Sequence, residues 1–389
     1  MSRSFRRIDR VCARSKHPLT AVDLFSGCGG LTGGLRAAGF AVLAAVEKDA
    51  DTAASYTANH PGVRLYETDI RRLPASRLIQ DLPALQKSRL DLIAGCPPCQ
   101  GFTRLTERHS WDDPRNQLVR EYLRFVRVLR PRACMLENVP GLLTRGKELF
   151  DELRSGLEAA GYFLTYEVLE LADYGVPQFR KRLVLLASAD NPIEIPPPTH
   201  CDPASGKNQR HWRTVRHAVG SMLQPPLRSE VRSGAVLPPY PWHVARNVAP
   251  DVRRRLEHAL RSDKGRADLP EELRLACHKR YPNGYFDVYG AMSWDSPSPT
   301  ITSGCTNASK GRFGHPSFPR PLTAREAAKL QTFPLDYRFE GPGVDSVAVQ
   351  IGNALPKRFA TVIGRAVAAH LADPQRATTT EIQGRRRVT

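Results

Sequence analysis

The chain has 389 residues, of which 41% are hydrophobic and 25% charged, a composition typical of a folded protein and unlike that of a disordered or collagen-like chain. No run of 18 or more apolar residues appears, and residues 1–16 are basic without an apolar stretch, so the sequence predicts neither a membrane-spanning helix nor a secretory signal. The 57 Lys and Arg residues exceed the 39 Asp and Glu residues, and the resulting net charge of +18 favours a polyanionic partner over the alternative of a basic protein without one.

In the first half of the chain, short apolar runs alternate with stretches of helical spacing. Strands are predicted over residues 19–25, 40–46, 90–94, 133–136, 163–168 and 183–187, and helices over 31–38, 50–59 and 117–129. Strands that alternate with helices form βαβ units. The pattern therefore predicts an α/β fold with a doubly wound, mostly parallel sheet that is covered on both faces.

The character of the sequence changes after residue 190. Residues 191–320 hold 17 of the 32 prolines and 19 Lys and Arg against 11 Asp and Glu, with no βα alternation but several tryptophans and tyrosines. We interpret this stretch as an inserted, irregular domain; disorder is the alternative, which the aromatic residues disfavour. The first α/β part then spans 18–190, helices over 321–376 complete it, and 1–17 and 377–389 are basic tails.

Eight cysteines are spaced irregularly along the chain, and without an export signal they are typical of reduced cytosolic thiols. Cys96 and Cys99 form one Cys-x-x-Cys pair, with Pro97 and Pro98 between them. Because no second pair completes a zinc site, we predict no metal.

The first chemical signal is the segment Asp-Leu-Phe-Ser-Gly-Cys-Gly-Gly over residues 23–30, placed between a predicted strand and helix. Such glycines let the backbone approach a ligand closely, although a tight structural turn is the alternative. Thr32 stands where the dinucleotide fingerprint needs glycine, which disfavours NAD. Glu47 and Asp69 end the next two units, where acids can bind a ribose and an adenine edge. A nucleoside cofactor is therefore indicated.

Further candidates follow later strands. Cys99 lies just after the predicted strand 90–94, where a thiolate could act as a carbon nucleophile, and Glu137 lies after strand 133–136, where its acid could donate a proton. Gln178, Arg180 and Arg182 form a run whose guanidinium groups suit a carbonyl or phosphate. An inert cysteine, a helix-capping acid and a solvated basic turn are the respective structural alternatives.

Two C-terminal segments have a structural interpretation first. Residues 320–334 predict a helix that is capped by Thr323 and Glu326 in a capping box. Residues 350–356 read as a loop that leads into a final helix over 353–371.

Taken together and in this order, the segments resemble the DNA (cytosine-5) methyltransferases, over about residues 21–371 apart from the middle domain. Residues 23–30 resemble the S-adenosylmethionine loop, Pro98-Cys99-Gln100 the catalytic Pro-Cys motif, and residues 137–139 the Glu-Asn-Val motif. Residues 178–182 resemble the Gln-x-Arg-x-Arg motif, and 323–331 and 350–356 the two C-terminal motifs. The middle domain then corresponds to the target recognition domain.

The resemblance implies a site. Cys99 would be the nucleophile that adds to cytosine C6, Glu137 would engage N3, and Arg182 would bind O2 with Arg180 in support. Cys96 has no matching role. The residues implied to bind S-adenosyl-L-methionine, whose product is S-adenosyl-L-homocysteine, are Asp23, Phe25, Gly27, Gly29, Gly30, Glu47, Asp69, Ile70, Pro98 and Asn353. Those implied to bind DNA are Gln100, Thr103, Arg104, Arg115, Gln178, Ser303 and Gly304. Further candidates for reading bases are Trp212, Arg213, Arg246, Asn283 and residues 303–307.

The expected partner is double-stranded DNA from which the target base is flipped out, because the reacting atoms are inaccessible in a stacked duplex. We expect a monomeric bacterial enzyme of the cytoplasm, associated with the nucleoid, that acts alone or beside a cognate restriction endonuclease. Three alternatives remain: a tRNA-modifying member of the same family, a non-catalytic DNA-binding protein, and a nucleotide-dependent oxidoreductase.

Overall fold

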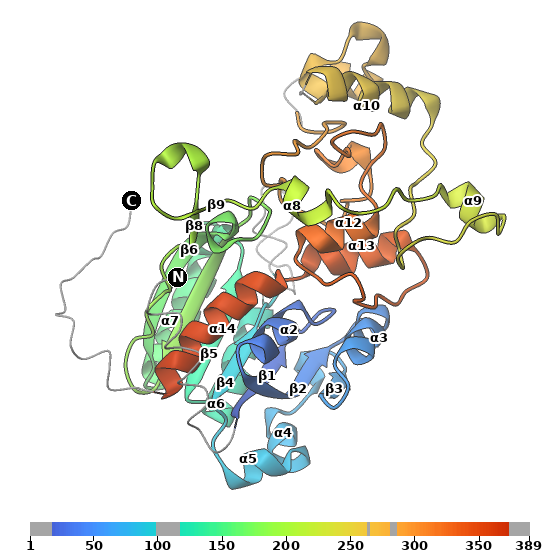
Figure 1. The fold of residues 1–389 in the computed structure, drawn as a ribbon. Coiled ribbons are helices and arrows are strands. Elements are labelled where there is room, and N and C mark those ends of the chain that lie inside the picture. Colours follow the sequence, from blue (N-terminus) through green and yellow to red (C-terminus); the bar gives the residue numbers. More distant parts are fainter. Residues whose placement is uncertain (1–17, 99–116, 263–264, 281–285, 373–389) are drawn as a thin grey trace.

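The computed structural model describes residues 18–98, 117–262, 265–280 and 286–372. Its centre is a seven-stranded sheet in the order β3-β2-β1-β4-β5-β7-β6 (Figure 1). The strands are β1 (Leu19–Leu24), β2 (Phe40–Glu47), β3 (Arg64–Glu67), β4 (Leu92–Gly95), β5 (Ala133–Asn138), β6 (Phe163–Glu170) and β7 (Lys181–Ser188). Strands β1 to β5 pair in parallel, whereas β7 runs antiparallel to both β5 and β6. The predicted mostly parallel α/β fold is confirmed.

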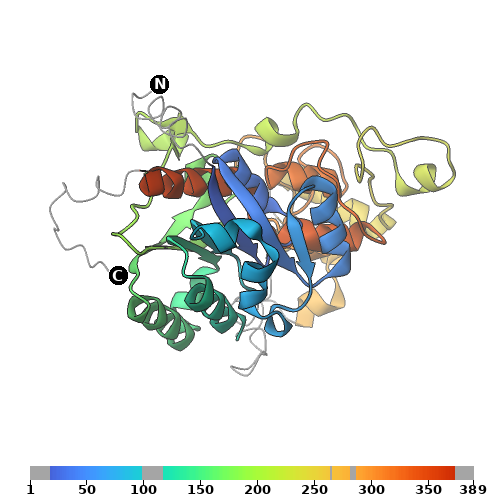
Figure 2. The ribbon, with the colours of Figure 1, turned by 90° about the horizontal axis from the view of Figure 1, so that it is seen from below.

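Helices cover both faces of this sheet, as Figure 2 shows. One face packs against α4 (Ala75–Asp81), α6 (Leu118–Leu129) and α7 (Lys147–Ala159), and the other against α2 (Gly30–Ala37) and α14 (Lys357–Ala372). The alternation of β1 explains this arrangement, because Val22 and Leu24 face the first helix layer and Ala21 faces the second. The helices α3 (Ala50–Asn59) and α5 (Pro83–Lys87) complete the crossovers.

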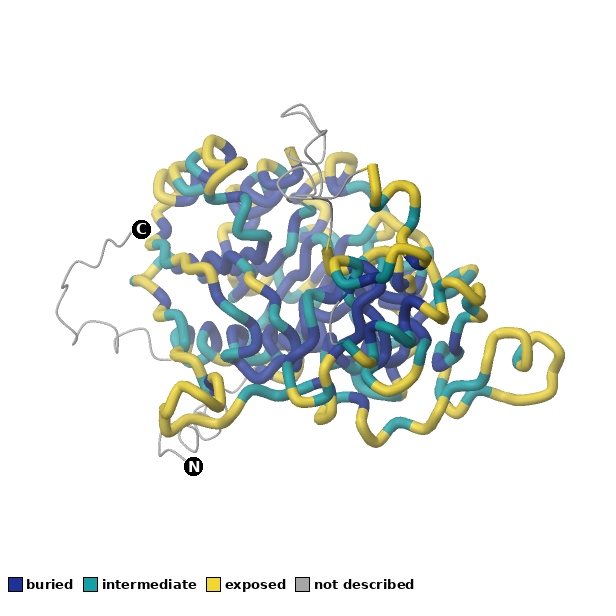
Figure 3. The backbone as a smooth tube through the Cα atoms, turned by 90° about the horizontal axis from the view of Figure 1, so that it is seen from above, coloured by how far each residue is buried: buried dark blue, intermediate teal, exposed yellow. Residues whose placement is uncertain are grey.

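The segment after the sheet forms a second lobe with little regular structure. Before this lobe begins, β8 (His200–Cys201) and β9 (Arg210–His211) form a small sheet beside the end of β6 (Figure 1). The elements of the lobe are α8 (Val215–Val219), α9 (Arg228–Arg232), α10 (Pro250–Ser262), α11 (Ala276–Arg280), α12 (Ala324–Leu330) and α13 (Val344–Asn353). Short 3-10 helices are η2 (Ile70–Arg72), η4 (Pro140–Leu143), η5 (Leu171–Tyr174), η6 (Pro203–Ser205), η7 (Arg266–Asp268), η8 (Glu271–Leu273) and η9 (Ala308–Lys310). Figure 3 shows buried residues concentrated in the sheet and its helices, and exposed residues along the loops.

The C-terminal helices differ in part from the prediction. The predicted final helix over 353–371 corresponds to α14, which begins only at Lys357, after Pro356, while Asn353 ends the separate helix α13. Residues 350–353 are therefore helical rather than part of a loop. Only α14 packs on the sheet, whereas α12 and α13 share an apolar core with α8, Ile301 and Phe313. The capping box of α12 is present as expected, since Thr323 Oγ1 accepts from Glu326 N at 3.1 Å and Glu326 Oε2 accepts from Thr323 N at 2.8 Å.

No helix among the described residues is long and apolar enough to cross a membrane.

Candidate active site

The strand register gathers the predicted site residues at one edge of the sheet. Leu24 at the end of β1 pairs with Val46 of β2 and Gly95 of β4, and Gly95 pairs with Leu136 of β5. Because parallel strands end at the same edge, the segments that follow them meet there. The antiparallel β7 begins at this edge, since its Leu183 pairs with Asn138. The glycine loop, Glu47, the Cys96–Pro98 segment, Glu137 and the Arg180–Arg182 run are therefore neighbours.

The glycine loop after β1 has a backbone that side chains rarely permit. Gly27 and Gly29 have φ of 55° and 95°, and Phe25 has φ of 61°. A Cβ at Gly29 would lie 2.2 Å from His60 Nε2 and 2.9 Å from the Tyr337 hydroxyl, so no larger residue fits there. A Cβ at Gly30 would lie 2.4 Å from Leu355 O. The loop is thus held closely against the segment between α13 and α14.

Glu47 is tied to the glycine loop by backbone hydrogen bonds. Its Oε2 accepts from Gly27 N at 3.0 Å, and its Oε1 accepts from Lys48 N at 2.8 Å and Asp49 N at 2.9 Å. Burial raises the pKa of this carboxyl, and the three backbone donors oppose that shift. The carboxylate is consequently fixed in position at the end of β2 but only partly buried.

Asp69 begins the 3-10 helix η2 after β3. Its carboxylate accepts from the Arg71 guanidinium at 3.0 and 2.5 Å, and this hydrogen bonding holds its pKa at about 2. Ile70 beside it is buried. The acid therefore stays ionised, and its Arg71 contact occupies oxygens that the prediction assigns to an adenine edge.

Asp23 is a buried carboxyl just before the loop, and Thr32 is its partner. The Thr32 hydroxyl donates to Asp23 Oδ2 at 2.6 Å, and Tyr56 Oη lies 2.8 Å from Thr32 Oγ1. Asp23 Oδ1 is buried without a hydrogen-bond partner among the described residues. Burial raises the pKa of Asp23 to about 7. Thr32, which stands where the dinucleotide fingerprint has glycine, thus fixes the Asp23 carboxyl through a hydrogen bond. The sequence predicted only cofactor binding for Asp23.

These groups fit a nucleoside cofactor that carries a cationic end. A Cβ at Gly27 would meet nothing within 4 Å, so the loop leaves open space above the strand ends. The aromatic ring of Phe25 and the orphaned Asp23 oxygen at the end of β1, and the fixed Glu47 carboxylate at the end of β2, lie at the same edge of the sheet. Asn353 ends α13, two residues before Leu355, whose carbonyl packs against Gly30 of the glycine loop. Among the described residues, no group of three or more His, Cys, Asp or Glu side chains could hold a metal ion.

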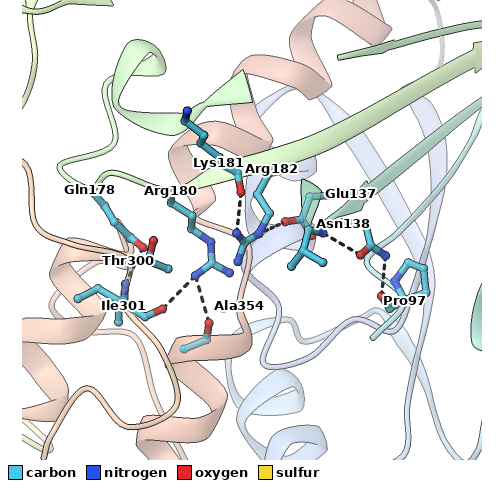
Figure 4. Close-up of polar contacts among 12 residues, drawn as sticks. Pro97, Glu137, Asn138, Gln178, Arg180, Lys181, Arg182, Thr300, Ile301 and Ala354 are labelled. Carbon is cyan, nitrogen blue, oxygen red and sulfur yellow. Dashed lines mark hydrogen bonds and ion pairs between the residues drawn. The ribbon is translucent and has the colours of Figure 1, made fainter. Parts of the chain in front are cut away.

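Glu137 and Arg182 form an ion pair at the same edge, with Arg182 Nε 2.7 Å from Glu137 Oε1 (Figure 4). Their side chains are 9% and 13% exposed, so the pair is shielded from water yet reachable. Arg182 Nη1 also donates to Lys181 O at 2.7 Å. Asn138 Nδ2 donates to Pro97 O at 3.1 Å, which ties the segment before Cys99 to the strand that carries Glu137.

Cys96 lies between these groups. Burial, and then the Glu137 carboxylate, raise the pKa of the Cys96 thiol well above its usual range. Cys96 is therefore a protonated thiol at neutral pH and not an activated nucleophile.

Arg180 and Gln178 are buried deeper and hydrogen-bond to other protein groups, although Arg180 Nε has no hydrogen-bond partner among the described residues. Arg180 Nη1 donates to Ile301 O at 3.0 Å and to Gly352 O at 3.3 Å, and burial lowers its pKa to about 9. Gln178 Nε2 donates to Gln331 Oε1 at 2.8 Å, and Gln178 Oε1 accepts from Ile301 N at 2.8 Å. The predicted DNA contact of Gln178 would require it to leave these partners.

Gln331 is the residue that sequence reasoning missed as an individual contact. Its Nε2 donates to Ile351 O at 2.6 Å and Ala354 O at 3.2 Å, and its Oε1 accepts from Gln178, so it joins α12, α13 and the segment before β7. The signal in the sequence was only its place at the end of the capped helix.

The structure places the remaining predicted residues as follows. Ser303 is exposed, Gly304 is partly buried, and a Cβ at Gly352 would lie 2.3 Å from Ser303 N, so this segment packs on α13. Pro98 is partly buried. The predicted nucleophile, four predicted DNA contacts and one candidate for reading bases lie outside the described residues: Cys99, Gln100, Thr103, Arg104, Arg115 and Asn283.

The sheet order, the loop after β1 and the acid after β2 define the Rossmann-like fold of S-adenosylmethionine-dependent methyltransferases. Two solved structures share the fold. One is an E. coli prophage-encoded protein described as a DNA modification methyltransferase, with a TM-score of 0.64 and 23% identity, covering 90% of this chain and 99% of that one. The other is the S. pombe Dnmt2 methyltransferase, with a TM-score of 0.53 and 19% identity, covering 92% of this chain and 98% of that one.

The family model for C-5 cytosine-specific DNA methylases matches residues 19–369, and the chain belongs to this family. It is 37% identical to the Type II methylase M.HgiDII of Herpetosiphon aurantiacus, over 89% of this chain and 94% of that protein. It is 31% identical to the Type II methyltransferase M1.HphI of Haemophilus parahaemolyticus, over 90% and 86%. The chain is therefore a DNA (cytosine-5) methyltransferase, as its sequence motifs indicated.

Proposed function

We propose that this enzyme methylates C5 of a cytosine that is flipped out of double-stranded DNA, through a covalent bond between Cys99 and C6. The observation that carries the proposal is the shielded Glu137–Arg182 pair, 2.7 Å apart, beside the segment that leads to Cys99. S-adenosyl-L-methionine supplies an electrophilic methyl group, and the family implies its use.

The reaction needs three protein groups because cytosine C5 is a poor nucleophile. The Cys99 thiolate forms a bond to C6 while Glu137 protonates or hydrogen-bonds N3, so negative charge does not build up on the ring. Arg182 binds O2. C5 then gains the methyl group, loses its proton to a base, and the Cys99–C6 bond breaks to restore the aromatic ring.

In the free enzyme, Glu137 and Arg182 form an ion pair with each other, and this pair persists until a cytosine enters the site. Because both side chains are mostly buried, their pairing avoids two isolated charges. An incoming cytosine offers N3 to the acid and O2 to the guanidinium, and so replaces one partner of each. The buried contacts of Arg180 with Ile301 and Gly352 fix the start of β7, so Arg180 supports Arg182 by positioning it.

The cofactor would lie over the glycine loop. Phe25 offers a ring face, Glu47 a fixed carboxylate for ribose hydroxyls, and Asp23 Oδ1 an unpaired acceptor for the amino group. Asp69, Ile70 and Pro98 border the adenine and methyl ends in this arrangement, and Asn353 approaches from α13. No metal is required for these contacts.

The proposed partner is duplex DNA, and the basic middle segment reads its sequence. The relatives M.HgiDII and M1.HphI are Type II enzymes from bacteria, which supports a role in restriction-modification with a cognate endonuclease, or as an orphan modification enzyme. We propose that the enzyme is a monomer that acts in the bacterial cytoplasm on the nucleoid.

The test is methyl transfer from labelled S-adenosyl-L-methionine to duplex DNA or bulk tRNA, with Cys99→Ser beside the wild type and bisulfite sequencing of the product. Label in DNA that is absent with Cys99→Ser supports the proposal and reveals the target sequence. Label in tRNA alone overturns the DNA assignment, and full turnover by Cys99→Ser overturns the nucleophile.

A further inference from the structure

Four cationic residues, which we call the hinge cation cluster, lie on segments that meet where the chain leaves the sheet for the second lobe. They are Arg210 of β9, Arg213 just after it, Lys329 of α12 and Arg358 in the first turn of α14. Lys329 lies on α12, whose apolar residues belong to the core of the second lobe, and Arg358 lies on the helix that packs on the sheet. In Figure 1, α14 begins close to α12 and α13 and runs away from them across the sheet. The cluster therefore spans the junction between the two lobes.

Rigid contacts hold the four elements in place. His200 pairs with Arg210 in the two-stranded sheet, and a Cβ at Gly175 would lie 2.5 Å from His200 Cε1 and 2.8 Å from Arg358 Nε. The His200 ring and the Arg358 guanidinium thus lie side by side over Gly175. Thr332 Oγ1 accepts from Arg358 N at 2.9 Å, which fixes the first turn of α14 to the end of α12.

Thr332 adopts φ of 65° to make this contact, a backbone conformation that is costly for a β-branched residue. Trp212 holds the hinge strand on the other side. Its Nε1 donates to Asp173 Oδ1 at 2.7 Å, and its ring packs edge-on against Phe179.

The members of the cluster are close enough to repel one another. Burial and then Arg213 lower the pKa of both Lys329 and Arg358, and Arg210 lowers that of Arg358 further. Burial, Arg358, Arg210 and Arg213 lower the pKa of His200 to about 4, so its ring is neutral. Arg213 therefore disfavours the charged form of two other members, Lys329 and Arg358.

No carboxylate of the described residues forms an ion pair with any of the four cations, and none of their side chains has a hydrogen-bond partner there. Nearby acids of the same segments form hydrogen bonds with other groups, since Asp173 accepts from Trp212 and Asp202 Oδ1 accepts from Ala204 N at 2.9 Å. By contrast, Arg216 on α8 forms two 2.8 Å hydrogen bonds with Asp295. The hinge cation cluster lacks the counter-ion that its neighbour has.

We propose that the hinge cation cluster binds phosphates of the DNA backbone outside the catalytic pocket and thereby holds both lobes on the duplex. The inference rests on the proposed duplex DNA substrate, which is the polyanion that this enzyme meets. Trp212 contacts Phe179, the residue between Gln178 and Arg180, so the cluster adjoins the segment that carries Arg182. The assignment makes Arg213 a phosphate contact rather than a base-reading residue.

The experiment measures duplex affinity against salt concentration for Arg213→Gln, Lys329→Gln, Arg358→Gln and the triple variant. Removing one phosphate contact lowers the slope of log K against log salt by about 1. We therefore expect each single variant to lose about one unit of slope and the triple variant about 2 to 3. Arg154→Gln, on the exposed part of α7, removes the same charge elsewhere and should leave the slope unchanged.

A second measurement separates binding from folding. Removing one of several repelling cations should raise the thermal midpoint of the DNA-free protein while DNA affinity falls, whereas a merely structural residue would lower both. Slopes equal to that of Arg154→Gln overturn the proposal. So do slopes that change with tRNA but not with duplex DNA. If wild-type enzyme methylates duplex DNA in the same preparation, either failure concerns the cluster alone and not the proposed function.

Discussion

The buried Asp23 carboxyl should make the stability of the enzyme depend on pH in a way that one substitution removes. Burial raises its pKa from 3.8 to about 7. In the unfolded chain the proton leaves near the ordinary value. Between these values the folded protein holds a proton that the unfolded chain has lost, so the free energy of unfolding falls as pH rises through this interval.

The expected size follows from the shift. A group that is protonated only in the folded state changes the unfolding free energy by about 1.4 kcal/mol per pH unit, or about 3 kcal/mol between pH 5 and pH 7. Asp23→Asn has no proton to lose and keeps an acceptor for the Thr32 hydroxyl. The wild-type curve should therefore decline relative to the variant up to about pH 7 and run parallel to it above.

The assay is urea unfolding without cofactor, followed by circular dichroism at pH 5, 6, 7 and 8. Thr32→Val is the matched control, because loss of its hydrogen bond to Asp23 should move the interval to higher pH. Curves for wild type and Asp23→Asn that stay parallel from pH 5 to pH 8 would refute the reasoning.

Three further outcomes are expected. Glu137→Gln should slow methyl transfer by at least 100-fold while cofactor affinity, measured by calorimetry, stays within about twofold, because the acid acts on the base; equal losses would make Glu137 structural. Gly34→Ala should destabilise the fold by about 1–3 kcal/mol in urea unfolding, because its Cβ would lie 2.3 Å from Ala360 Cβ on α14. Gly33→Ala is the control and should cost far less, because its Cβ would contact only the Lys357 side chain, at 3.5 Å. Glu326→Gln should cost about 3–5 kcal/mol, because it leaves the buried Arg320 guanidinium without the carboxylate it binds at 2.7 and 2.8 Å; a loss below 1 kcal/mol would contradict this.

Six of the seven strands of the sheet were predicted, because short apolar runs mark them, whereas β3 was not. Helix 50–59 agrees with α3, and most other predicted elements lie within two residues of those observed. The pattern could not reveal that β7 inserts antiparallel between β5 and β6, because strand order depends on tertiary pairing. Helices α7 and α13 were not predicted, and α13 lies where residues 350–353 were interpreted as a loop.

The site was predictable where a motif fixes the local backbone and less so where distant segments meet. The hydrogen bond from Gly27 N to Glu47 and the position of Glu137 follow from strand ends that reach one edge of the sheet. The contacts of Gln178 with Ile301 and Gln331 join residues more than 100 positions apart, which no local pattern encodes. The absence of ion pairs for Arg213 within the described residues is likewise a property of the folded chain.

The central claim is that Cys99 forms a bond to cytosine C6, and trapping that bond tests it most directly. In duplex DNA whose target cytosine carries fluorine at C5, the final loss of a proton cannot occur, so the enzyme should stay attached to the DNA on a denaturing gel in the presence of S-adenosyl-L-methionine. We predict this complex for the wild type and its absence for Cys99→Ser. A covalent complex with Cys99→Ser, or none with a wild-type enzyme that methylates the unmodified duplex, would contradict the account.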